Sequence, residues 1–272
     1  MTSRAVPRPL QLSIIPVGAF DLEVAALTPG DRSGRRTAAP VYAYLVDTPQ
    51  GLLLFDTGCS RTLMADPPRI LGAGVTALTP MMDASRDYIT ERLQAMGVDP
   101  AAVAMVATSH LHFDHAGANA DPAWAGATFL VQRAEWEAVR KAPHQYPDPG
   151  LAPPAGARLQ LLDGDTEVAP SVTLVSTPGH TPGHQSLMVR FERGGGVFIT
   201  SDAVYTRAHY DPGHVGAAVD PQQSAQSVAR IQALCQEHGL VPFFSHDPHQ
   251  AADEGWQMAP YAYAAHPFPT SS

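Results

Sequence analysis

Residues 110–115 read His-Leu-His-Phe-Asp-His, and this short segment constrains the chain more than any other. Residues two apart in an extended or looping backbone point the same way, so His110 and His112 can hold one metal ion. Asp114 and His115 follow the turn and can face a second ion. Chance placement would give this pattern in roughly one of several hundred such chains. Because these groups crowd one another unfavourably without a bound cation, the segment predicts a metal site.

The charge composition excludes several other kinds of site. The chain has 17 Lys+Arg against 26 Asp+Glu, a net charge of −9, and its single lysine is Lys141. Lys141 lies in VRKAPHQ, without the context that a Schiff-base enzyme, a phosphate-binding loop or a kinase requires, and no GxSxG motif is present. The net negative charge would repel a phosphate backbone, so a nucleic-acid partner is not expected. The most basic stretch, Arg32 to Arg36, is typical of a solvated loop.

The distribution of apolar and cysteine residues bears on location. No apolar run approaches the roughly 20 residues of a membrane helix, and the N-terminal segment lacks a convincing cleavage site, so we expect no membrane insertion. The two cysteines, Cys59 and Cys235, have no CxxC neighbour. A reducing cytoplasm is the simplest setting for such a chain.

The apolar patterns predict strands and helices in alternation. The predicted strands are 10–17, 41–48, 51–58, 103–110 and ATFLVQ at 127–132; the predicted helices are 85–97, RAEWEAVRK at 133–141, and 221–239. A turn around Pro49 to Gly51 joins the second and third strands. Strand 103–110 is apolar until it reaches the His/Asp segment, as expected of a central strand that leads into a site.

We expect one domain over residues 1–272, with two β-rich halves. The halves are 10–141 and 158–247, separated by a Pro-rich loop at 142–157 and followed by a tail at 248–272. Each half contains strands and ends in helix, a pattern that predicts an α/β fold in four layers, αββα, with two packed sheets flanked by helices.

Further candidate ligands follow later predicted strands. His180 ends the segment VTLVSTPGH, Asp202 ends VFITSD, and His246 ends VPFFSH. A single histidine at a strand end is usually structural, but three strand ends that supply metal-binding side chains form a pattern. His184 competes with His180 in TPGHTPGH, and the residues alone do not choose between them.

The motifs SHLHFDHAG, TPGHTPGHQSL, SDAVYT and FFSHD occur in this order, and together they resemble the metallo-β-lactamase superfamily. Within it the chain is most similar to the N-acyl homoserine lactonases, over roughly residues 10–247. These motifs identify the superfamily with high specificity, but they indicate the substrate with lower specificity. The resemblance implies the αββα fold, a dinuclear zinc site, and a hydrolase that opens the lactone ring of N-acyl homoserine lactones by attack of a metal-bridging hydroxide.

The resemblance also implies a role for each ligand. It assigns His110, His112 and His180 to one metal, Asp114, His115 and His246 to the other, and Asp202 to the bridge between them. It therefore selects His180 over His184. We expect two Zn²⁺, or other divalent transition metals, because imidazole and carboxylate suit such ions. Asp114 is in addition expected to carry a proton to the departing alkoxide.

Two aromatic residues are implied to contact the substrate. Tyr205 lies three residues after Asp202, where the lactonases carry a tyrosine that contacts the substrate carbonyl, and its phenol could donate to a developing oxyanion. Phe113 resembles the pocket aromatic of the family. The alternative is packing against the sheet edge for Tyr205 and a position in the core for Phe113.

Several other interpretations compete with this one. Asp56-Thr57-Gly58 matches the aspartic protease tripeptide, but such enzymes need two of these aspartates, so Asp56 is expected to accept hydrogen bonds beside the metal loop. A pyridoxolactonase-like hydrolase would use the same metals. A glyoxalase-II-like thioesterase shares every ligand type but usually carries a basic C-terminal extension, which this sequence lacks. A metal module without catalysis would need only four ligands.

The variable segment 60–83 bears on the substrate. It contains seven large apolar residues and few charges. These are Leu63, Met64, Ile70, Leu71, Leu78, Met81 and Met82. Such a rim would suit an acyl chain or the surface of a homodimer, and the residues do not choose between these uses.

Overall fold

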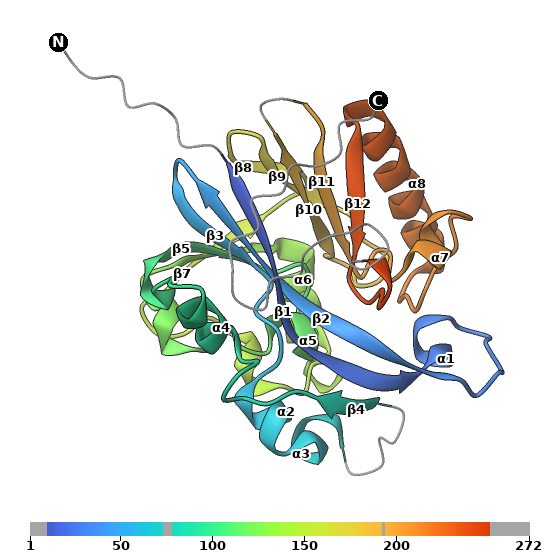
Figure 1. Ribbon diagram of the computed structural model, residues 1–272, viewed down its shortest axis with the longest axis horizontal. Helices are drawn as coiled ribbons and strands as arrows, with labels where there is room; N and C mark the ends of the chain where they lie inside the picture. The colour runs from blue at the N-terminus through green and yellow to red at the C-terminus, as the bar shows by residue number, and fades with distance from the viewer. Residues whose placement is uncertain (1–9, 73–77, 192–193, 251–272) are drawn as a thin grey trace.

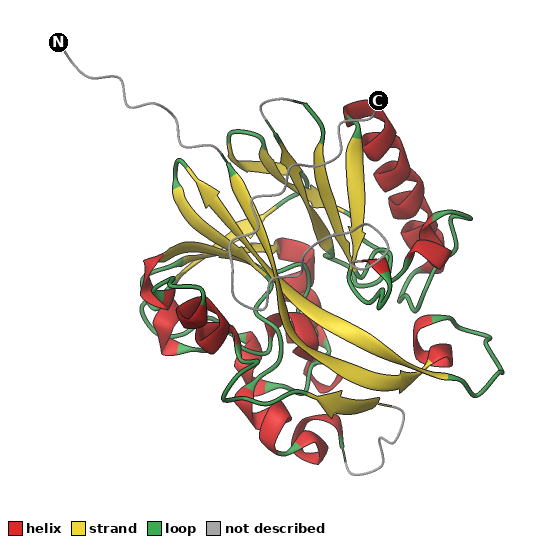
Figure 2. Ribbon diagram, in the orientation of Figure 1, coloured by secondary structure: helices red, strands yellow, loops and turns green. Residues whose placement is uncertain are grey.

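Two β-sheets of seven and five strands form the centre of the protein, with helices on their outer sides (Figures 1 and 2). The structure is a computed structural model, and it describes residues 10–72, 78–191 and 194–250. Helix α8 packs on the second sheet, whereas α4 and α6 pack on the first. The predicted four-layer sandwich is therefore confirmed.

The first sheet is mixed and has the order β4-β1-β2-β3-β5-β6-β7. Its strands are β1 (Gln11–Glu23), β2 (Arg36–Thr48), β3 (Gly51–Phe55), β4 (Leu78–Met81), β5 (Val103–Ala107), β6 (Thr128–Gln132) and β7 (Arg158–Leu162). The pairs from β3 through β7 are parallel, whereas β1 is antiparallel to both β2 and β4. The β2–β3 pairing joins Thr48 to Gly51, which confirms the predicted tight turn.

The second sheet has the order β12-β11-β10-β9-β8. Its strands are β8 (Thr166–Ala169), β9 (Val172–Ser176), β10 (Gln185–Arg190), β11 (Gly196–Ser201) and β12 (Leu240–Phe244). Only the β11–β12 pair is parallel.

Most helices of the described chain are short. The α-helices are α1 (Val24–Leu27), α2 (Arg61–Ala65), α3 (Pro67–Leu71), α4 (Ile89–Ala95), α5 (Phe113–Ala116), α6 (Arg133–Lys141), α7 (Arg207–Tyr210) and α8 (Pro221–His238). Four 3₁₀ turns complete them, at Pro100–Ala102, Pro122–Trp124, Pro143–Gln145 and Pro149–Leu151. None of the helices in the described segments is both long and apolar enough to cross a membrane.

Three apolar layers hold the sandwich together, and β2 shows why both faces of the first sheet are apolar. Its residues Tyr42 and Tyr44 pack between the sheets with Phe243 of β12, whereas Ala43 and Leu45 pack on the outer face. Side chains alternate along a strand, so a strand buried on both faces is apolar at every position. The third layer joins the outer face of the second sheet to Val228, Ile231 and Cys235 of α8.

The structure differs from the sequence expectations at several boundaries. Strands β1 and β2 extend beyond 10–17 and 41–48 as a long twisted ribbon that ends at α1, and α4 is shorter than the predicted helix at 85–97. Strand β7 pairs with β6, so the sheets divide between Leu162 and Thr166 rather than at the Pro-rich loop. Residues 73–77 of the variable segment and 251–272 of the tail lie outside the described residues.

The fold brings the carboxyl ends of several strands to one place between the sheets. Strands β3, β5 and β6 run parallel, so the loops after them lie at one edge of the first sheet, and the loops after the parallel strands β11 and β12 lie at one edge of the second. His115, after β5, lies 3.2 Å from Asp202, after β11, so these two edges meet. Two residues at this edge, Asp56 (φ 61°) and Ser201 (φ 46°), adopt the left-handed backbone region that residues with a side chain rarely occupy. Strained backbone of this kind clusters at functional sites.

Candidate metal centre

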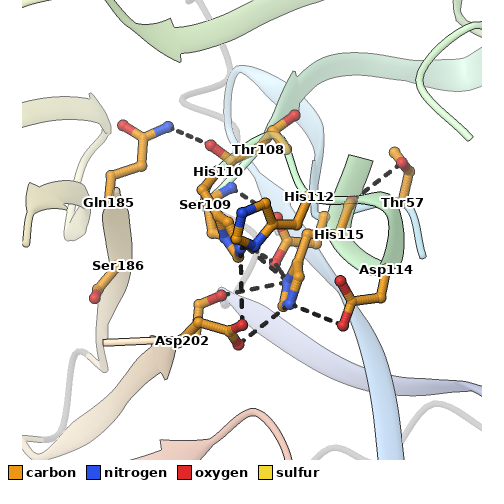
Figure 3. A network of polar contacts seen from close by, with 12 residues as sticks. Thr57, Thr108, Ser109, His110, His112, Asp114, His115, Gln185, Ser186 and Asp202 are labelled. Atoms are coloured by element: carbon orange, nitrogen blue, oxygen red, sulfur yellow. Dashed lines mark hydrogen bonds and ion pairs between the residues drawn. The ribbon is translucent and has the colours of Figure 1, made fainter. Parts of the chain in front are cut away.

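Three histidine nitrogens converge at the edge between the sheets. His110 Nε2 lies 2.9 Å from His112 Nδ1 and 3.2 Å from His180 Nε2, and His112 Nδ1 lies 3.1 Å from His180 Nε2. His110 and His112 come from the loop after β5, and His180 from the loop after β9. With Asp202, these atoms form one group that could hold a metal ion. Figure 3 shows His110, His112 and Asp202 of this group.

The hydrogen bonds behind the first group decide which ring nitrogens carry protons. His180 Nδ1 lies 2.8 Å from the carbonyl oxygen of Ala217, which can only accept, so this nitrogen is the donor. The Ser109 hydroxyl donates to Asp56, and its oxygen therefore accepts from His110 Nδ1 at 3.0 Å. In the neutral rings, His110 Nε2 and His180 Nε2 then face each other with lone pairs. A cation between them resolves this repulsion, so the donor set fits a divalent metal.

A second group consists of Asp114, His115 and His246. His246 Nδ1 lies 2.8 Å from the carbonyl oxygen of Pro40, and His115 Nδ1 lies 2.9 Å from Asp56, so each ring directs Nε2 into the site. The two Nε2 atoms lie 3.6 and 3.7 Å from Asp114 Oδ2.

Asp202 lies between the two groups. Its Oδ1 is 3.2 Å from Nε2 of both His115 and His246, whereas Oδ2 is 3.7 Å from His110 Nε2 and 3.5 Å from His180 Nε2. Each carboxylate oxygen thus faces a different group, as a bridging ligand requires. Buried atoms His115 Nε2 and Asp202 Oδ1 have no hydrogen-bond partner, which is a second sign that the site suits a cation.

Burial and neighbouring charges set the protonation of these residues. Burial lowers the pKa of His112 to about 3, aided by the charge of His180. Burial likewise lowers the pKa of His110 well below its usual value. Burial opposes the charged form of His115 as well, but the carboxylates of Asp202 and Asp114 outweigh it and raise its pKa. His110 and His112 are therefore neutral imidazoles, which is the form that binds metal.

The structure separates the two histidines of TPGHTPGH. His180 belongs to the first group, whereas His184 is fully buried behind it, with Nδ1 2.9 Å from the Thr177 hydroxyl. The ring centroid of His184 lies 5.2 Å from that of His110. His184 therefore packs behind the rings of the first group rather than among them.

Tyr205 lies against both groups. Its ring centroid is 5.7 Å from that of His180 and 5.6 Å from that of His246. The hydroxyl lies 3.1 Å from His180 Nδ1 and donates to the carbonyl of Ala217 at 3.3 Å. Burial, with the charges of Asp202 and Asp114, raises the pKa of this phenol well above its usual value. Tyr205 therefore remains a hydrogen-bond donor at neutral pH.

Phe113 lies at the boundary between the metal centre and an apolar pocket. Its ring packs edge-on against Phe20, with centroids 5.8 Å apart. The pocket has a volume of about 330 Å³ and is lined by residues of α3, β4, α5 and the Pro-rich loop. Its lining residues are Ile70, Leu71, Leu78, His112, Phe113, His144, Gln145, Tyr146 and Pro147. Leu63, by contrast, is fully buried in the core, and Met81 is exposed.

One residue that shapes the site was predicted from the sequence, and several others were not. Asp56 was expected to accept hydrogen bonds, and it does so from the Ser109 N–H and hydroxyl. The carbonyl of Ala217, which orients His180, lies in an irregular loop with no motif. Glu135 appeared only as one residue of a helix, and Gln185 only as the start of a strand. Nothing in their local pattern indicates contact with the metal loops.

The family model of the metallo-beta-lactamase superfamily matches residues 36–257. This range includes every residue of the two groups. Among known relatives, an N-acyl homoserine lactonase of Bacillus thuringiensis is 33% identical over 241 residues, covering 88% of this chain and 94% of its own. The N-acyl homoserine lactonase AttM of Rhizobium radiobacter is 29% identical over 277 residues, covering 94% and 99%.

Solved structures give the same result. An N-acyl homoserine lactone hydrolase with N-hexanoyl-L-homoserine bound at its catalytic metal centre superimposes with a TM-score of 0.79 at 32% identity, covering 89% of this chain and 95% of that one. A variant of AiiA from Bacillus thuringiensis with N-decanoyl-L-homoserine at its active site gives 0.80 at 31% identity, with the same coverage. The chain belongs to the metallo-beta-lactamase superfamily and, within it, to the N-acyl homoserine lactonase family.

Proposed function

We propose that this protein is a metal-dependent hydrolase that opens the lactone ring of N-acyl homoserine lactones. The observation that carries the proposal is the pair of ligand groups that share Asp202, each carboxylate oxygen facing one group. The relatives support the substrate class, because two of their structures hold N-acyl homoserines, the ring-opened products, at the site.

The residues would hold two divalent ions, and zinc suits this donor set. His110, His112 and His180 would bind one ion and Asp114, His115 and His246 the other, with Asp202 between them. When bound, such ions supply a water of lowered pKa and polarise a carbonyl as Lewis acids.

The chain's own residues orient the lactone and handle its protons. Tyr205 lies against both groups and retains its phenolic proton, so it can donate to the carbonyl oxygen as negative charge develops there. Asp114 is only slightly exposed and lies beside His115 and His246. Its carboxylate can take up the proton of the attacking water and pass it to the alkoxide as the ring C–O bond breaks.

The apolar pocket beside Phe113 would receive the acyl chain. Its walls are mainly aliphatic and aromatic, and His112 connects it directly to the metal centre. Leu71→Trp, which adds bulk to one wall, is expected to lower kcat/KM for long acyl chains more than for short ones. The exposed Leu159, on β7, provides the matched control, and Leu159→Trp should leave the chain-length profile unchanged.

Proton release during ring opening tests the reaction directly. Metal-loaded protein is mixed with a series of N-acyl homoserine lactones in weakly buffered indicator solution, with Asp202→Ala as the control. Rapid release that depends on metal and on Asp202 supports the proposal. If the series is inert while metal analysis finds about two ions per chain, the metal site stands and the substrate class is wrong. Pyridoxolactone and thioesters are then the next substrates.

The cytoplasmic location and a homodimer remain predictions from the sequence. Cell fractionation tests the first, and sedimentation of the purified protein tests the second.

A further inference from the structure

Glu135, in the first turn of α6, is almost completely buried, with 1% of its surface exposed. Its carboxylate accepts two backbone hydrogen bonds from different parts of the chain. Oε1 lies 2.9 Å from the amide nitrogen of Leu111, and Oε2 lies 3.1 Å from that of Gly183. One side chain thus connects two loops that are 72 residues apart in sequence.

Both loops carry histidines of the first ligand group. Leu111 lies between His110 and His112, and Gly183 follows His180 by three residues. The two loops come from different sheets, after β5 and after β9. The distance between them therefore depends on contacts across the sandwich, and Glu135 makes such a contact close to the ligands.

The fit between Glu135 and the second loop is tight. A Cβ atom on Gly183 would lie 2.1 Å from the backbone nitrogen of Glu135 and 2.5 Å from its Cβ. Only glycine permits this approach, so the loop of His180 rests directly on the first turn of α6. A shift of that turn would move the loop with it.

A charged group at this position needs a physical reason. Burial raises the pKa of Glu135, and the hydrogen bond from the Leu111 N–H opposes that shift. Burying a carboxylate is costly unless it is well hydrogen-bonded. Gln185 already ties the sheets farther back, where its amide donates to the carbonyls of Thr108 and Leu130 (Figure 3 draws the first). Glu135 adds acceptors for the loops themselves.

We propose that Glu135 is a positioning residue, which holds the loop of His110 and His112 at a fixed distance from the loop of His180 and so preorganises these three histidines for a divalent ion. The inference rests on the proposed function in that it takes these histidines as metal ligands. It adds a residue that touches neither metal nor substrate.

The test measures metal affinity separately from activity. Glu135→Gln keeps the size of the side chain but replaces one acceptor oxygen with an NH₂ group, so one loop N–H loses its partner. Zn²⁺ binding is measured by competition with a chromophoric chelator, and the melting temperature of the metal-free protein is recorded. We expect the tighter Zn²⁺ dissociation constant to rise about 10- to 100-fold, the usual effect of losing an outer hydrogen-bond partner of a metal site.

Glu137→Gln is the matched control, because Glu137 lies on the same helix, is exposed and pairs with Lys141 at the helix surface. It should bind Zn²⁺ as the wild type does. If Glu135→Gln does not fold, Glu135→Asp keeps the charge but is too short for both loops, and it should show the same weakening.

The outcomes distinguish failure of the positioning role of Glu135 from failure of the proposed metal-dependent function. A folded Glu135 variant with weakened Zn²⁺ binding and a normal Glu137→Gln supports the positioning role. Wild-type affinity in a folded Glu135 variant, even one with a lower melting temperature, overturns it, and so does failure of both Glu135 variants to fold. If the wild type itself binds no divalent ion, the proposed function falls as well.

Discussion

Gly216 provides the sharpest test of the position of Tyr205. A Cβ atom on Gly216 would lie 2.5 Å from Tyr205 Cε2 and 2.6 Å from Cδ2, whereas ordinary contact begins at 3.4 Å. Gly216→Ala must therefore open a gap of about 0.9 Å, the difference between 3.4 and 2.5 Å. The loop has little room to retreat, because the carbonyl oxygen of Leu27 would already lie 3.2 Å from the new methyl. Displacing a positioned group by about 1 Å costs roughly 100-fold in rate.

We therefore expect Gly216→Ala to lower kcat for lactone opening about 100-fold and to destabilise the fold by about 1–3 kcal/mol, as overpacking does. Proton release gives the rate, urea unfolding gives the stability, and metal analysis checks that the ions are retained. Gly126→Ala is the control, because Gly126 is exposed and its added methyl would meet nothing within 4 Å.

A double-mutant cycle with Tyr205→Phe tests the cause of the loss. If Gly216→Ala acts by displacing the phenol, it should cost little in the Tyr205→Phe background. Equal losses in both backgrounds would show that the reasoning about Tyr205 is wrong, and an undiminished kcat for Gly216→Ala alone would refute it directly.

Three further outcomes are expected. Tyr205→Phe should lower kcat by roughly 10- to 1000-fold, the usual scale for a lost oxyanion donor, with the metal content unchanged by elemental analysis. Chelation should abolish lactone opening and lower the melting temperature while the circular dichroism spectrum is retained, because the apolar layers do not depend on the ions; collapse of the spectrum would assign the metals a structural role. Asp87→Asn should destabilise the protein by about 1–3 kcal/mol at pH 7 in urea unfolding, since Asp87 is buried against Arg86 and Arg92. Burial opposes ionisation of Asp87, but hydrogen bonds from Arg86 and a backbone N–H outweigh it and lower its pKa. The stabilising effect of the carboxylate is therefore complete above the unfolded value of about 4 and is lost as the pH falls through the lower folded value, so the two proteins should converge in acid.

The residues grouped in the site follow strands with strong apolar patterns, which explains why the sequence predicted their positions. His110, Asp202 and His246 each follow such a strand, and parallel strands bring their carboxyl ends to one edge. The residues alone leave His180 and His184 equivalent, because both follow the same strand and lie in the same Thr-Pro-Gly-His pattern. The family resemblance selected His180, and the structure places His180 in the first group.

The sheet boundary was harder to predict for a related reason. Proline and glycine mark the loop at 142–157 as irregular, and this composition predicted the division between the halves there. Strand β7, however, has a mostly exposed pattern and lies at the edge of the first sheet beside β6. An edge strand joins a sheet through backbone hydrogen bonds to its neighbour, and few of its side chains are buried. Its sequence pattern therefore says little about which sheet it joins.

The same distinction separates the ligands from the residues that hold them. A metal ligand must be one of a few residue types, so clusters of histidine and aspartate are visible in a sequence. A residue that positions a ligand needs only to offer a hydrogen-bond acceptor or to allow another segment to approach closely. Here the Ala217 carbonyl and the Glu135 carboxylate are the acceptors, and Gly183 allows the close approach because it has no side chain. Each is an ordinary residue in an ordinary local pattern. Variation of metal affinity within this fold is therefore expected to arise as much from such supporting positions as from the ligands themselves.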